Sequence, residues 1–94
     1  MNKQEYIEML QNRIADLNEK LEKLQLQAKL AEMEYREDLQ SEIKRFQAKR
    51  DEITEILERM QKAGEGAWGE LRKGAEQSFE SMKDALKKAK SHME

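Results

Sequence analysis

Residues 7–24 read IEMLQNRIADLNEKLEKL, and their apolar positions decide the fold. These positions recur at steps of three and four, which places them on one face of an α-helix with a mean period of 3.5 residues. A stripe with this heptad spacing is typical of a left-handed coiled coil. Extended to its end, the stripe comprises Ile7, Leu10, Ile14, Leu17, Leu21, Leu24, Ala28 and Ala31.

An apolar face with similar spacing continues towards the middle of the chain. Two successive four-residue steps, from Tyr35 through Leu39 to Ile43, form a stutter that locally unwinds a supercoil. No proline interrupts the pattern, so we expect one long helix over residues 3–63, with Asn2 and Glu5 as its N-terminal capping pair. The apolar members of this second part are Tyr35, Leu39, Ile43, Phe46, Ile53, Leu57 and Met60.

A glycine-rich segment, GEGAWG at residues 64–69, ends the predicted long helix. Three glycines in six residues would cost a continuous helix about 3 kcal/mol relative to alanine. We expect residues 64–66 to form a turn with Gly64 and Gly66 as its hinge, and Gly64 to end the helix in the left-handed conformation. Because the turn is short, it predicts a helical hairpin.

An eleven-residue repeat follows the turn. Residues 67–77, AWGELRKGAEQ, align with residues 78–88, SFESMKDALKK. Eleven residues in three turns favour a nearly straight amphipathic helix, which we expect over residues 67–91. The side chains expected to pack against the first helix are Trp68, Leu71, Ala75, Phe79, Met82 and Leu86.

These elements predict an all-α protein with a single helical domain over residues 1–94, in which a long and a shorter helix form an antiparallel hairpin. The shorter helix would cover only the second half of the longer one, and the stripe from Ile7 to Ala31 would face water. A soluble monomer does not tolerate such a stripe. We therefore expect this stripe to form an oligomer interface, in a dimeric or tetrameric coiled coil or four-helix bundle.

Composition argues against several other classes of protein. Charged residues make up 40% of the chain, but the net charge is only -2, so the basic excess of a nucleic-acid-binding protein is missing. Disorder is disfavoured because the charges nearly balance and the apolar residues are periodic. Without cysteine the chain has no disulfide or thiolate metal site. No signal peptide or membrane span is expected, and the predicted location is cytoplasmic.

Three patterns suggest chemistry, and each has a plainer explanation. Gly64, Gly66 and Gly69 have the spacing of a dinucleotide fingerprint, but that motif needs a preceding strand, and here a helix precedes it. His92 is the only histidine and lies near the chain end, where we expect a frayed surface residue. The acids lie outside the apolar stripe and form no Glu-x-x-His motif. We therefore expect no catalytic residues, no cofactor, no metal and no enzymatic activity.

The segment after the turn resembles the C-terminal signature of a family of small bacterial coiled-coil stress-response proteins. Members of that family combine a long helix, a glycine-containing turn and a repeat of the form AWxEL(K/R), although Phe79 stands here where they often repeat the tryptophan. The resemblance implies a structural or protective role during stress. It is carried by Ala67, Trp68, Glu70, Leu71, Arg72, Ala75, Phe79, Met82 and Leu86.

The leading hypothesis is a non-enzymatic, self-associating coiled-coil protein. Two alternatives remain open at this point. The helix over residues 67–91 is amphipathic and could lie on a membrane surface, although interfacial helices favour Lys and Arg and this polar face mixes both signs. The uncovered heptads from Ile7 to Ala31 could instead offer a groove to a helix of an unidentified protein partner.

Overall fold

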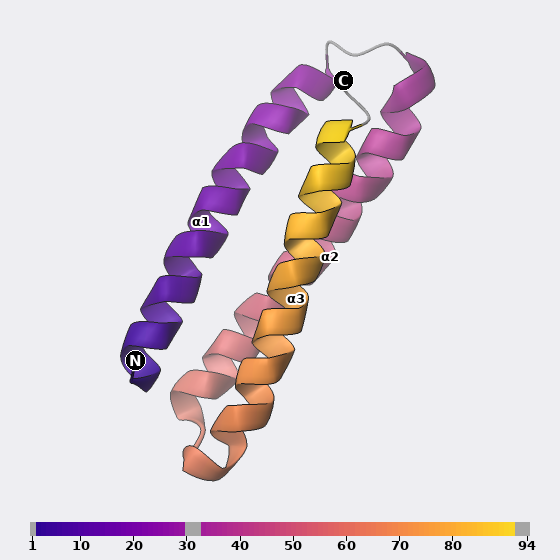
Figure 1. Cartoon of the computed structure of the whole chain (residues 1–94). Coiled ribbons are helices and arrows are strands. Elements are labelled where there is room, and N and C mark those ends of the chain that lie inside the picture. Colours follow the sequence, from indigo (N-terminus) through magenta and orange to yellow (C-terminus); the bar gives the residue numbers. More distant parts are fainter. Residues whose placement is uncertain (1, 30–32, 92–94) are drawn as a thin grey trace.

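Three helices form an elongated bundle of 49 × 18 × 16 Å in the computed structural model, which describes residues 2–29 and 33–91 (Figure 1). They are α1 (Lys3–Ala28), α2 (Met33–Lys62) and α3 (Glu65–Ser91). Neighbours in the sequence run antiparallel, so α1 and α3 run in the same direction. Every regular element of the described residues is a helix, which confirms the predicted all-α class.

The prediction of one helix over residues 3–63 is wrong. The first helix ends at Ala28, and α2 begins at Met33 and runs back along α1. The ammonium group of Lys3 donates hydrogen bonds to the carbonyl oxygens of Gln61 at 3.1 Å and Ala63 at 2.9 Å. The start of α1 therefore lies beside the end of α2. The physical reason is burial, because folding back removes the stripe of α1 from water within one molecule.

The stripe of α1 consequently does not face water, which corrects the premise of the predicted oligomer interface. Its six large members are 0–8% exposed and belong to the hydrophobic core that the described residues form: Ile7, Leu10, Ile14, Leu17, Leu21 and Leu24. Ala31 and the side chain of Ala28 lie outside the described residues. A second copy of the chain is thus not required to shield this surface.

The hairpin of α2 and α3 is the most closely packed part of the bundle. Most side chains predicted to pack in it are buried, and Trp68, Leu71 and Leu86 are partly buried against the same core. The side chain of Tyr35 lies outside the described residues. The buried members are Leu39, Ile43, Phe46, Ile53, Leu57, Met60, Ala75, Phe79 and Met82.

The turn between α2 and α3 is shorter than predicted. It consists of Ala63 and Gly64, while Gly66 already belongs to α3, which begins at Glu65 rather than at residue 67. Among the described glycines none has a positive φ, so the expected left-handed cap at Gly64 is wrong. The chain reverses instead through a bond from the Ala63 amide to the Met60 carbonyl at 3.4 Å. Bonds of this i→i+3 type tighten a last helical turn without any left-handed residue.

Candidate binding groove between α1 and α3

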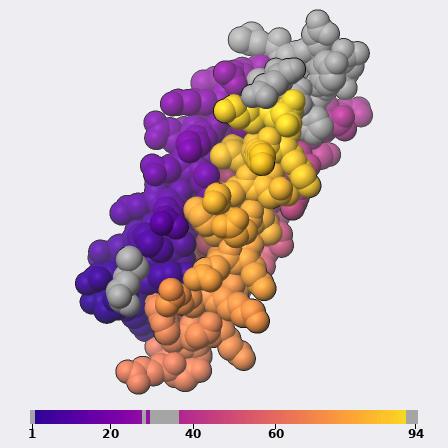
Figure 2. Space-filling view, in the orientation of Figure 1, coloured from indigo at the N-terminus to yellow at the C-terminus, as the bar shows by residue number. Residues whose placement is uncertain are grey.

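The face on which α1 and α3 lie side by side carries the candidate site (Figures 1 and 2). These two helices are not neighbours in the sequence, and they pack on each other less extensively than α2 packs on α3. Because their backbones are less closely packed, their side chains leave hollows along the seam. The seam has an aromatic cluster near the start of α1 and a lysine-lined groove nearer its end.

The aromatic cluster centres on Tyr6, which is 4% exposed. Its ring meets that of Trp68 edge-on, with centroids 5.5 Å apart and planes at 79°. The guanidinium carbon of Arg72 lies 4.7 Å from the centre of the Tyr6 ring. The Tyr6 hydroxyl donates to Glu76 Oε1 at 3.2 Å, and Arg72 Nε donates to the same oxygen at 3.2 Å. The first turns of α1 are therefore held to α3 by stacking, charge and a hydrogen bond together.

This environment changes the acidity of Tyr6. Burial raises the pKa of its hydroxyl above the ordinary value of 10.0, and the neighbouring negative charge of Glu76 raises it further, while Arg72 acts in the opposite direction. The hydroxyl therefore stays protonated at neutral pH and acts as a hydrogen-bond donor. Its ring and its hydroxyl both contact side chains of α3, so Tyr6 holds the start of α1 against that helix.

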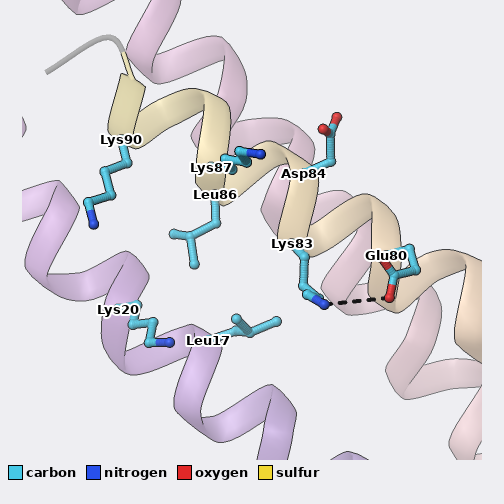
Figure 3. A pocket seen from close by; sticks show the side chains of 8 residues that line it. All are labelled: Leu17, Lys20, Glu80, Lys83, Asp84, Leu86, Lys87 and Lys90. Carbon is cyan, nitrogen blue, oxygen red and sulfur yellow. Dashed lines mark ion pairs between the residues drawn. The ribbon is translucent and has the colours of Figure 1, made fainter. Parts of the chain in front are cut away.

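The second feature is the α1–α3 groove, a hollow of about 560 Å³ between the two helices (Figure 3). Leu17 of α1 and Leu86 of α3 extend into the space between the helices. Lys90 reaches from α3 towards α1 above them, and Lys20 lies on the α1 side. The complete lining consists of Leu17, Lys20, Glu80, Lys83, Asp84, Leu86, Lys87 and Lys90.

The two acids of the α1–α3 groove already have basic partners. Glu80 pairs with Lys83 at 3.6 Å. Asp84 pairs with Arg45 of α2 at 3.1 Å and with Lys88 at 3.2 Å, and it points away from α1 in Figure 3. Hydrogen bonds from Lys88 and Arg45 lower the pKa of the Asp84 carboxyl below its ordinary value. The groove thus presents positive charge above an apolar floor.

A second hollow of about 500 Å³ adjoins the α1–α3 groove, because Glu80 lines both. Its apolar lining comes from Met9 and Leu10 of α1 and Phe79 of α3. It extends towards the aromatic cluster, since Tyr6 and Arg72 line it as well. The two hollows therefore lie one after the other along the seam between α1 and α3, with Glu80 between them.

The structure brings together only part of the predicted site. Leu17 and Leu86, assigned from the sequence to an oligomer interface and to hairpin packing, meet here at the floor of the groove. The lysines of the groove and the Tyr6 cluster were not predicted, since nothing in the sequence indicated that α1 lies beside α3. In the sequence, each lysine has a plainer role than ligand binding. Lys20 follows Asp16 at the i,i+4 spacing of a solvated ion pair, and Lys90 lies where it complements the dipole of a helix end.

Within residues 2–29 and 33–91, no group of three metal-binding side chains gathers. The same part of the chain contains no helix with the length and apolar character needed to cross a membrane. Comparisons with protein-family models, with curated proteins and with solved structures find no match to this chain. Its class is therefore set by the fold and the site: an antiparallel three-helix bundle with a lysine-lined groove between its first and third helices.

Proposed function

We propose that this chain is a non-enzymatic, self-associating helical protein in which copies join by exchanging α1. The observation that carries the proposal is a contrast within the bundle. Helix α1 has a complete apolar heptad stripe, yet it packs on the hairpin of α2 and α3 much less extensively than those two helices pack on each other. Its stripe would fit the hairpin of a second copy equally well, because that hairpin offers the same surface.

Exchange of α1 would change the free energy of the fold little, because α1 buries the same stripe against the partner's hairpin as against its own. The sequence between the two helices supports this step. Residues 25–36 read QLQAKLAEMEYR, which contains no glycine or proline and is dominated by residues with good helix propensity. When α1 leaves its own hairpin, this stretch can join α1 to α2 as one helix.

A pair of introduced cysteines tests the exchange directly, since the chain has none of its own. Asn18 of α1 and Arg50 of α2 face each other, with Arg50 Nη1 donating to Asn18 Oδ1 at 3.3 Å. The variant Asn18→Cys/Arg50→Cys would be treated with a short bis-maleimide and run on a denaturing gel. Exchange joins two different chains, so we expect a covalent dimer whose fraction rises with protein concentration.

Light scattering on the untreated protein gives its mass in solution, which is then compared with the bridges seen on the gel. Side-by-side association without exchange would give a dimeric mass with bridges only within single chains, and it would overturn the exchange mechanism. A monomeric mass at every concentration would overturn self-association altogether. The single variant Asn18→Cys is the control for bridges that form between copies by collision.

We extend the proposal to a structural or protective role during bacterial stress in the cytoplasm. The support is the resemblance of residues 67–89 to the stress-response family, together with an assembly that heat or concentration could shift. The membrane-surface alternative receives less support, because the apolar face of α3 is buried in the bundle at Ala75, Phe79 and Met82. Lipid binding through that face would require the hairpin to open first.

A further inference from the structure

We infer that the α1–α3 groove binds a single-chain anionic amphiphile of the fatty-carboxylate type. Its head group would lie between Lys20 and Lys90, and its alkyl chain would lie on Leu17 and Leu86. Leu17 also belongs to the apolar stripe of α1, so the groove forms wherever α1 packs beside an α3, in its own chain or in a partner's. Binding of a ligand there goes beyond self-association. Three observations carry the inference: the charge of the groove, its size and its continuation along the seam.

The charge of the groove selects an anion. Lys20 and Lys90 form no ion pair within residues 2–29 and 33–91, whereas the acids beside them are paired with Lys83, Lys88 and Arg45. The chain as a whole carries a net charge of -2, so this positive patch is a local exception. A carboxylate placed between two ammonium groups forms charge-assisted hydrogen bonds, which are among the stronger polar interactions in proteins.

The size of the groove favours a small ligand over a partner helix. A volume of about 560 Å³ lies within the range of small-molecule sites, roughly 300–1,000 Å³. Its floor offers two leucines, whereas a docked amphipathic helix needs a row of apolar anchors at successive turns. On the α1 side the lining spans only Leu17 to Lys20, which is about one helical turn. An alkyl chain needs no more than this.

The adjoining hollow gives the alkyl chain somewhere to continue. Met9, Leu10 and Phe79 line it, and it meets the α1–α3 groove at Glu80. A chain that starts at Lys20 and Lys90 can therefore run along the seam towards the start of α1, covering Leu86 and Met9, the partly buried apolar side chains of the two hollows. Burial of apolar surface adds to the electrostatic attraction and selects a ligand with a tail over a bare anion.

Titration calorimetry with dodecanoate, at neutral pH and below its micelle concentration, tests the site in the full-length chain. We expect saturable binding of one molecule per chain. The variant Lys20→Gln/Lys90→Gln should weaken this affinity by about tenfold or more, because the head group then has no ammonium partner at either position. The control is Lys23→Gln/Lys73→Gln, which removes the same charge from exposed positions of α1 and α3 outside the groove. It should bind dodecanoate like the original protein.

Other ligands separate the possible sources of binding. Inorganic phosphate carries charge without a tail, and dodecyltrimethylammonium carries the same tail with the opposite charge. We expect both to bind at least about tenfold more weakly than dodecanoate. Equal binding of either one would overturn the inference, as would equal loss of affinity in the two lysine variants. Pelleting with phosphatidylglycerol vesicles without binding of monomeric dodecanoate would overturn it too. Circular dichroism establishes that each variant keeps the helical content of the original.

Discussion

The Arg72 guanidinium carbon lies 4.7 Å from the centre of the Tyr6 ring, so a charged side chain of α3 covers an aromatic side chain of α1. The two residues lie far apart in the sequence, and both bond Glu76. Among the described residues, the bond from Tyr6 to Glu76 is the only side-chain hydrogen bond between α1 and α3. This cluster therefore holds the start of α1 at a place where the helices otherwise pack thinly.

Replacing Arg72 with glutamine should lower the free energy of unfolding by about 1 kcal/mol, the scale of a cation–π contact at a partly exposed site. The loss of its half-exposed ion pair with Glu76 adds little. The matched control is Arg59→Gln, which breaks the exposed pair with Glu55 on α2 at 2.9 Å and should cost at most about 0.5 kcal/mol. Urea unfolding measures both values. Equal losses in the two variants would mean that the Tyr6 contact contributes nothing.

Stability should fall in alkaline solution partly because of Tyr6. The pKa of its hydroxyl is raised in the folded state, chiefly by burial and then by the charge of Glu76. The contribution of this group is fully present below the unfolded pKa near 10, and it is lost as pH rises through the higher folded pKa. The midpoint temperature of thermal unfolding should therefore fall more steeply between about pH 9 and 12 in the original protein than in Tyr6→Phe. Lysine titration affects both proteins and cancels in the comparison.

Two glycines inside α3 weaken the helix without serving a turn. Gly69 has nothing within 4 Å of an added Cβ, and at Gly74 the nearest atom would be Ile56 Cδ1 at 3.6 Å, an ordinary contact. Neither has a positive φ. We expect Gly69→Ala and Gly74→Ala each to raise the free energy of unfolding by about 0.5–1 kcal/mol, from helix propensity. Gly64→Ala, in the turn, should gain less. Destabilisation by Gly74→Ala in urea unfolding would show that α2 and α3 approach too closely there.

The periodicity of the sequence was sufficient to predict an all-helical chain and the hairpin of α2 and α3. It failed to place the end of α1 at Ala28, because glycine and proline are the usual signals for a helix end, and residues 25–36 contain neither. Two changes in the apolar pattern coincide with the end of α1. The large members of the stripe stop at Leu24 and alanines take over. Leu26 then lies off the stripe, and it is 63% exposed in the structure.

The candidate site could not be predicted once the end of α1 was missed. In a single long helix, Leu17 and Lys20 lie far from Leu86 and Lys90, so their meeting in the α1–α3 groove depends entirely on folding back. Tyr6 was overlooked for a related reason. It lies beside Ile7 at the edge of the stripe, and its burial comes from Trp68 and Arg72 of a helix that the predicted topology placed elsewhere.

The unequal packing of the three helices should be visible in amide hydrogen exchange. Backbone hydrogen bonds open most readily in an element that packs least closely on its neighbours. Since α1 packs less closely on the hairpin than α2 and α3 pack on each other, its amides should exchange faster than theirs. Mass spectrometry of peptides from 7–24, 43–60 and 75–89 measures this. Tyr6→Ala should speed exchange in α1 by more than about tenfold, because removing a buried aromatic ring costs more than about 1.4 kcal/mol. The hairpin peptides should change little. Uniform protection of all three segments would mean that the bundle opens only as a unit. Helix α1 could then move from its own hairpin to that of a second chain only after complete unfolding.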